Sequence, residues 1–203
     1  MSFTFEYNES LAKKADNAAS YLTEQGAYVG QFKQVIVKVS DMKGAKGFEL
    51  SFEVPGVGNA DLSLWTHSAE NKPYSDACFL NAMQYLLGVR TIKTTTAMVE
   101  RYDSELKERI EKETETVPEF CNKPIGLVLQ KELYSKTNGG TGERLLIAGV
   151  YQPETRLMVS ELQEKKTQPV KLDRLLKALK PKDSRKAAKD EPAQPSLGAD
   201  GGF

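Results

Sequence analysis

The sequence has few of the residues that most catalytic and metal sites require. It contains one histidine, His67, and two cysteines, Cys78 and Cys121. A site built on two histidines is therefore excluded, and no pair among these three residues has the spacing of a zinc-ligand motif. We expect no metal, no cofactor and no disulfide framework, a pattern typical of a small cytosolic protein.

Long hydrophobic runs and a net charge are also missing. The longest apolar runs, such as 127–129 and 145–150, are far shorter than the about 20 residues of a membrane helix, so we expect no membrane partner. Residues 1–7 have neither the basic nor the apolar region of a secretory signal, which predicts a cytoplasmic protein. Lys and Arg together number 28, as do Asp and Glu, so total charge neither favours nor opposes a nucleic-acid partner.

The pattern of apolar residues predicts a mainly β fold with helices. Five segments read as strands, and one amphipathic helix with the apolar stripe Phe79, Leu80, Met83, Leu86 and Leu87 stands between the third strand and the fourth. This order is that of a five-stranded Greek-key barrel of the OB type, whose helix lies between strands three and four. The predicted strands are 27–40, 48–54, 61–66, 124–134 and 144–151.

The remaining segments surround this predicted barrel, which spans residues 27–155. Residues 1–26 form an N-terminal segment with a short strand and a helix. Residues 91–122 form a helical insertion, because Met98, Tyr102, Leu106 and Ile110 are spaced four apart. A basic C-terminal helix is predicted within 156–180. Residues 181–203 are rich in Pro, Ala, Gly and charge without periodicity, which predicts a disordered tail.

Patterns of catalytic residues are absent. A Ser-His-acid triad would have to use His67, and no G-x-S-x-G motif surrounds any serine. The loop Asn138–Gly142 lacks the G-K-[ST] of a phosphate-binding P-loop and is typical of a hairpin turn. We therefore expect a protein that is not an enzyme; a hydrolase using His67 is the weaker alternative.

Binding residues are better represented. Trp65, the only tryptophan, shares a strand face with Asp61 and Ser63, where a base could stack on an exposed indole; the alternative is an indole covered by a terminal helix. Tyr134 carries the same two interpretations. The candidate cations lie on the first predicted strand or near the loops that border the groove of an OB barrel, where they would neutralise phosphates. They are Lys33, Lys43, Lys46, Lys131, Lys136 and Arg144.

Two observations keep other interpretations open. Lysines occur in the loops of any soluble protein, and Glu49 and Glu53 interrupt a uniformly positive face. The alternative function is therefore a protein-interaction module or recombination accessory protein, whose predicted helices 97–115 and 170–180 meet a protein partner and not DNA. An exposed edge strand would also allow copies of the chain to form a homo-oligomer.

Five short stretches carry a resemblance to a known family. They are Gly26–Gly30, Lys46–Phe52, Leu62–Thr66, Val99–Asp103 and Lys123–Gln130. In their order and spacing they resemble phage-encoded single-stranded DNA-binding proteins of recombination and replication modules. The resemblance covers roughly residues 20–165.

This resemblance implies an OB-type barrel that coats single-stranded DNA without sequence preference, in the cytoplasm of a bacterial host. It implies partners among phage or host recombinases, nucleases and polymerases. Many single-stranded DNA-binding proteins dock partners through an acidic tail closed by an aromatic residue, which gives Asp200 and Phe203 a partner-docking role here. The tail departs from that pattern because Asp200 is the only acid among the last ten residues.

Overall fold

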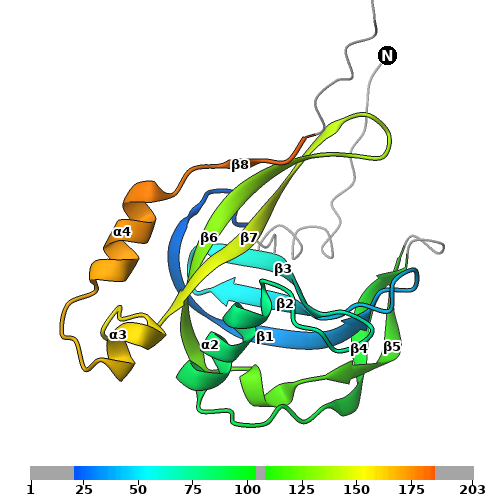
Figure 1. The fold of residues 1–203 in the computed structure, drawn as a ribbon. Helices are drawn as coiled ribbons and strands as arrows, with labels where there is room; N and C mark the ends of the chain where they lie inside the picture. The colour runs from blue at the N-terminus through cyan, green and yellow to red at the C-terminus, as the bar shows by residue number, and fades with distance from the viewer. Residues whose placement is uncertain (1–20, 104–107, 186–203) are drawn as a thin grey trace, which may run out of the picture.

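The computed structural model describes residues 21–103 and 108–185, which form eight strands of one sheet system and three α-helices (Figure 1). The short strand and most of the helix predicted within residues 1–26 lie outside the described residues, as do Asp200 and Phe203. The strands are β1 (Gly26–Val39), β2 (Lys46–Val54), β3 (Gly58–His67), β4 (Thr95–Asp103), β5 (Glu108–Thr116), β6 (Pro124–Ser135), β7 (Thr141–Tyr151) and β8 (Lys182–Asp183). The helices are α2 (Ala77–Leu87), α3 (Val159–Gln163) and α4 (Val170–Ala178), with a 3-10 turn, η1 (Pro118–Phe120).

Strand β1 is shared by two sets of partners. Its first residues, 26–31, pair antiparallel with β6, and residues 31–39 pair antiparallel with β2. Gly30 lies at this crossover, where a Cβ atom would stand 2.2 Å from the carbonyl oxygen of Glu53. The absence of a side chain at Gly30 therefore lets β2 approach while β1 changes partner.

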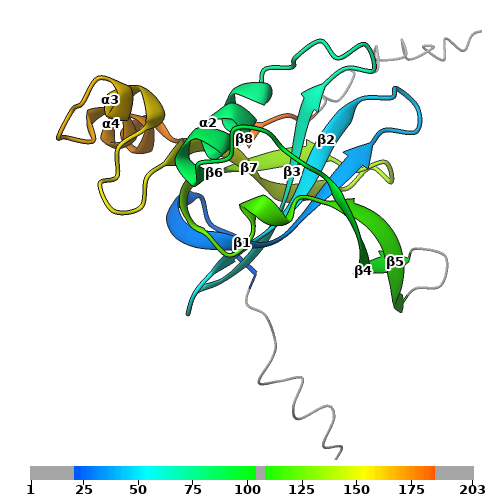
Figure 2. The ribbon, with the colours of Figure 1, turned by 90° about the horizontal axis from the view of Figure 1, so that it is seen from below.

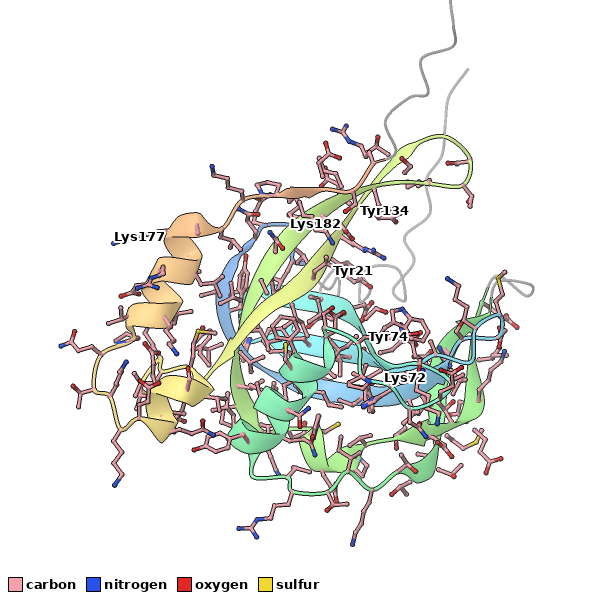
Figure 3. All side chains as sticks on the ribbon, viewed as in Figure 1. Tyr21, Lys72, Tyr74, Tyr134, Lys177 and Lys182 are labelled. Atoms are coloured by element: carbon pink, nitrogen blue, oxygen red, sulfur yellow. The ribbon has the colours of Figure 1, made fainter. Side chains whose placement is uncertain are left out.

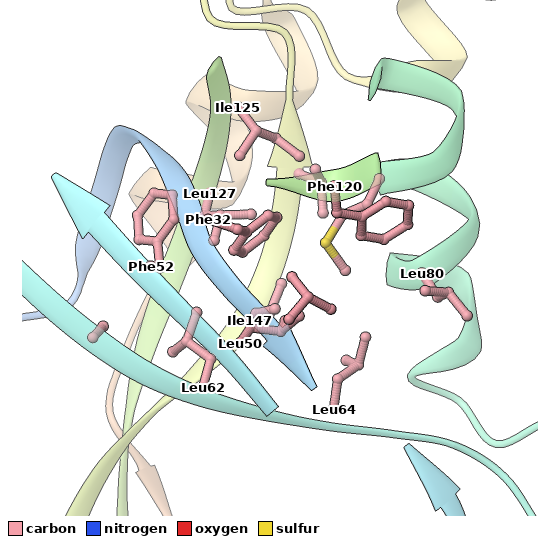
Figure 4. Close-up of a cluster of buried hydrophobic side chains, with 14 of the residues drawn as sticks. Phe32, Leu50, Phe52, Leu62, Leu64, Leu80, Phe120, Ile125, Leu127 and Ile147 are labelled. Atoms are coloured by element: carbon pink, nitrogen blue, oxygen red, sulfur yellow. The ribbon is translucent and has the colours of Figure 1, made fainter. Parts of the chain in front are cut away.

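The other strands complete a closed circuit around the core. β2 pairs with β3 and β6 pairs with β7, both antiparallel, while β3 and β7 come into contact without a hydrogen-bonded ladder. The strand order around the core is therefore β1, β2, β3, β7, β6 and back to β1, and α2 packs its buried Leu80 and Met83 against this core. Apolar side chains from every strand of the circuit meet inside it (Figure 4); they include Phe32, Leu50, Phe52, Leu62, Leu64, Leu127 and Ile147.

The predicted class, mainly β with helices, is confirmed, but the described residues form eight strands in place of five. The prediction of a helical insertion over 91–122 is wrong. Residues 95–116 form the antiparallel hairpin β4–β5, paired from Thr95–Thr116 to Asp103–Glu108. The hairpin meets β1 at the single pair Ile36–Thr116 and extends to one side of β1–β3 (Figure 2).

Helices α3 and α4 lie on the opposite side of the molecule from that hairpin (Figure 2). The basic helix predicted over 170–180 is α4, which buries Leu172 against Val128 and Tyr151, and a short helix, α3, precedes it within 156–180. The predicted disordered tail is wrong at its start, because Lys182 and Asp183 form β8 and pair parallel with β6. Among the described residues, no helix is long and apolar enough to cross a membrane.

Candidate nucleic-acid interface

The side of β1–β3 that faces away from the core carries three adjoining hollows. Their volumes are about 280, 400 and 270 Å³, and Asp61 on β3 lines all three. The first lies beside Tyr21 and Lys33, the second between β1–β3 and Arg101 of β4, and the third at the contact between β3 and β7. We call this region the hollowed face.

Trp65 is the last of a row of three residues on neighbouring strands of the hollowed face. Lys38 of β1 is the register partner of Gly47 on β2, which is the partner of Trp65 on β3. A Cβ atom on Gly47 would stand 3.0 Å from Cε3 of the indole, so the ring lies over the space that a side chain would fill. The ammonium of Lys38 crosses β2, donates to Ser63 Oγ and lies 4.2 Å from the centroid of the Trp65 ring.

Tyr134 has the same surroundings at the β6–β7 hairpin. Its register partner is Gly142, where a Cβ atom would stand 2.5 Å from Cζ of the phenol ring. Arg144, two residues further along β7, places its guanidinium 5.1 Å from the ring centroid. Trp65 and Tyr134 are both half-buried, and each therefore has a glycine of the next strand beneath it and a cation close to its ring.

Glu132 fixes the cations at the third hollow. Its side chain is only 3% exposed, and it accepts hydrogen bonds from Arg144 Nε at 2.6 Å, from Ser184 Oγ at 2.7 Å and from Lys182 Nζ at 3.0 Å. Burial alone would raise the pKa of Glu132, but the three donors outweigh it and lower the pKa to about 2. Figure 3 shows Lys182 and Tyr134 near each other where β8 runs along β6. The charged Glu132 therefore joins β8 to the hairpin that carries Tyr134.

The central hollow contains cations and carboxylates together. Arg101 Nη2 of β4 donates to Glu49 Oε2 of β2 at 2.7 Å. Partial burial lowers the pKa of Lys38, Glu49 raises it, and the nearby Arg144 and Arg101 lower it further. Lys38 therefore lies within the electrostatic field of both arginines, one from each flanking hairpin.

The structure brings only some of the sequence-predicted residues together. Trp65 and Arg144 line the same hollow, and Lys33 lines the first hollow while paired with Glu53 at 2.8 Å. Lys131 is turned toward Glu24 and Glu143, at 3.2 and 3.8 Å. Lys43 and Lys136 are exposed in the loops after β1 and β6. Lys46, which begins β2, is also exposed, and its ammonium donates to Asn71.

Three cations of the hollowed face were not among the predicted residues: Lys38, Arg101 and Lys182. Lys38 had a signal in the sequence, because it lies on a predicted strand and its polar side chain interrupts an apolar run. Arg101 and Lys182 had none, because the first was assigned to a helix and the second to a disordered tail.

The histidine and the two cysteines of the chain all lie in its described part. No group of three or more His, Cys, Asp and Glu residues there is placed to hold a metal ion. His67 lies at the end of β3, with Nδ1 3.1 Å from the hydroxyl oxygen of Thr66. Cys78 and Cys121 are free thiols, and burial raises the pKa of Cys121.

Comparisons of the chain with protein families, with curated proteins and with solved structures find no match.

Proposed function

We propose that this protein binds single-stranded DNA without sequence preference, and that it coats and protects the strand during phage replication and recombination. One observation carries the proposal. Two half-buried aromatic rings, Trp65 and Tyr134, each lie over a glycine of the next strand and beside a cation, and Arg144 connects the second ring to the hollow that contains the first. Aromatic platforms with interleaved cations are what sequence-independent binding of single strands requires.

We also propose that the strand circuit is an OB-type barrel. The order β1, β2, β3, β7, β6 around the core supports this assignment. Along the chain, α2 follows the third strand of the circuit, β3, and precedes the fourth, β6, with β4–β5 as an insertion after α2. In an OB barrel the two loops beside the binding groove are those after the first and fourth strands. Here these loops, residues 40–45 and 136–140, carry Lys43 and Lys136.

The chemistry follows from the types of group on the hollowed face. A base that stacks on Trp65 takes the position of the Lys38 ammonium, which then turns to the phosphate beside that base. A base that stacks on Tyr134 likewise displaces the guanidinium of Arg144, which then turns to the adjacent phosphate. Ring faces accept every base, and cations bind phosphate irrespective of sequence, so this arrangement favours coating of a strand over recognition of a site. Paired bases of a duplex are not free to stack on either ring.

The experiment is a titration of the protein with labelled oligo-dT at two salt concentrations, read by anisotropy and by Trp65 fluorescence, with duplex DNA as control. We expect binding that weakens with salt, quenches the tryptophan and is far weaker for duplex. Trp65→Ala and Tyr134→Ala should each weaken binding by about tenfold, from a stacking contribution of roughly 1–3 kcal/mol per base. Tyr85→Ala is the matched control, because Tyr85 is 50% exposed on α2, away from the hollowed face.

A second candidate function, binding of a protein partner in place of DNA, is favoured by the carboxylates on the same face. Glu49, Glu53 and Asp61 all line its hollows, so the face is not uniformly positive. Anisotropy and fluorescence that both stay flat at micromolar protein and low salt would contradict DNA binding and favour this candidate.

A further inference from the structure

The β4–β5 hairpin adds a cation to the hollowed face that the strand circuit does not contain. Arg101 of β4 reaches Glu49 of β2 at 2.7 Å, although 52 residues separate them in the sequence. β4 has no ladder with β1, β2 or β3, so this ion pair is a direct bridge between the hairpin and the face. The two side chains are 37% and 43% exposed.

Glu49 lies between two cations from different strands, Arg101 of β4 and Lys38 of β1. Arg101 donates to its carboxylate from the hairpin side, and Glu49 acts electrostatically on Lys38, whose ammonium lies over the Trp65 ring. All three charged groups line the central hollow of about 400 Å³. A carboxylate and a backbone phosphate are both anions that accept hydrogen bonds from a guanidinium in the same geometry.

We propose that the Glu49 carboxylate occupies the position of a strand phosphate, and that Arg101 of the β4–β5 hairpin is a phosphate-binding residue which Glu49 masks in the free protein. The inference rests on the proposed function, because the incoming phosphate belongs to the single strand stacked on Trp65. On binding, the phosphate replaces Glu49 at Arg101, and the hairpin becomes the second wall of the groove.

The exposure of the pair makes this exchange feasible. Ion pairs whose partners are both well solvated contribute little net free energy, so water and a second anion compete for the guanidinium easily. Glu132 is the contrasting case, because it is nearly fully buried with three donors and holds its cations far more firmly. Glu49 is therefore the carboxylate that a phosphate can displace, whereas Glu132 keeps its cations.

The experiment measures oligo-dT binding by the full chain and by Glu49→Gln, Arg101→Gln and the double variant, at several salt concentrations. Glu49→Gln should tighten binding about threefold to fivefold at low salt, because the phosphate no longer has to displace a carboxylate from Arg101. Arg101→Gln should weaken binding by a similar factor and flatten the salt dependence by roughly 0.7, the slope of one phosphate contact. In the Arg101→Gln background, most of the gain from Glu49→Gln should disappear.

The matched control is Glu164→Gln, which also removes one negative charge and one ion pair, that of Glu164 with Lys166 at 2.7 Å. Equal tightening by Glu164→Gln, no tightening by Glu49→Gln, or an undiminished gain in the Arg101→Gln background would each overturn the inference while wild-type binding stands. Absence of binding by the wild-type chain would instead overturn the proposed function. Thermal melts of the variants verify that each one is folded.

Discussion

At the scale of single residues, three glycines have the same relation to an aromatic ring on the next strand. Gly47, Gly142 and Gly126 are register partners of Trp65, Tyr134 and Tyr151, and a Cβ atom on any of them would lie within 3.0 Å of the ring. Tyr151 is buried beneath α4, whereas Trp65 and Tyr134 are half-buried. The same local arrangement therefore fills the core at one site and presents an aromatic ring on the surface at the other two.

The glycine beneath Trp65 can be tested by adding one methyl group. In Gly47→Ala the new Cβ would stand 2.3 Å from the backbone carbonyl oxygen of Leu64 and 3.0 Å from the indole, so β2 and β3 must shift. We expect a loss of about 1–3 kcal/mol in the free energy of unfolding, together with a changed tryptophan emission spectrum, because the ring is displaced.

Chemical denaturation followed by Trp65 fluorescence measures both effects. Gly140→Ala is the matched control, because its nearest atom would be Asn138 Oδ1 at 3.4 Å, an ordinary contact. If Gly47→Ala kept the stability and emission of the wild type, the ring would not be lying over Gly47 in solution.

At the scale of elements, Glu132 holds β8 on β6. Its pKa is lowered to about 2 from an ordinary value of 4.5, so the charged form is favoured by folding. The stabilisation is fully present above pH 4.5 and is lost as the pH falls through about 2. A shift of this size corresponds to up to about 3 kcal/mol in the free energy of unfolding.

We therefore expect Glu132→Gln to destabilise the protein at pH 7 and to differ progressively less from the wild type between pH 4.5 and pH 2. Urea denaturation at several pH values measures the difference between the two curves. Glu154→Gln, a change at an exposed turn, is the control and should lie close to the wild type throughout. A Glu132→Gln deficit that stayed constant down to pH 2 would contradict a charged, cation-bound Glu132.

The elements also show what the sequence can and cannot predict. The strands of the circuit and α2 could be predicted, because alternation and the apolar stripe of α2 reflect burial in one core. The β4–β5 hairpin could not be predicted from its composition, which favours a helix: β5 reads Glu108-Arg-Ile-Glu-Lys-Glu-Thr-Glu-Thr116. Helix propensity is a weak preference, and the pairing of β4 with β5 overrides it. Arg101 was absent from the predicted site because its segment, too, was predicted to be helical.

Local pattern identified the aromatic residues of the site but not their surroundings. Trp65 stood out by its type and by alternation along β3, and its outward direction follows from the buried Leu62 and Leu64 beside it. The row Lys38–Gly47–Trp65 depends on the register of three strands, which alternation alone does not set to the residue.

At the scale of the whole molecule, a net charge of zero conceals an uneven distribution of cations. Several lie on or beside the hollowed face. Others are exposed on α4, which lies across the molecule from the β4–β5 hairpin (Figure 2): Lys171, Arg174 and Lys177. Total charge therefore cannot indicate whether the protein binds a polyanion. The relevant quantity is how strongly each group of cations changes the salt dependence of binding.

A comparison of two charge reversals separates the loop between β1 and β2 from the general field of the protein. Lys43→Glu with Lys46→Glu changes two exposed cations at this loop, and Arg174→Glu with Lys177→Glu changes two exposed cations on α4. Both variants lower the net charge by four. A general repulsion of DNA would therefore affect them equally, whereas direct phosphate contact would affect only the variant whose cations lie along the strand.

We expect the loop variant to flatten the slope of log affinity against log salt by roughly 1.4, which is two phosphate contacts at about 0.7 each for a single strand. The α4 variant should retain nearly the wild-type slope. Oligo-dT anisotropy across a series of salt concentrations gives both slopes. An unchanged slope for the loop variant would remove Lys43 and Lys46 from the phosphate path and leave it to Lys38, Arg101 and Arg144, whereas equal flattening in both variants would show that the cations act only through the overall field.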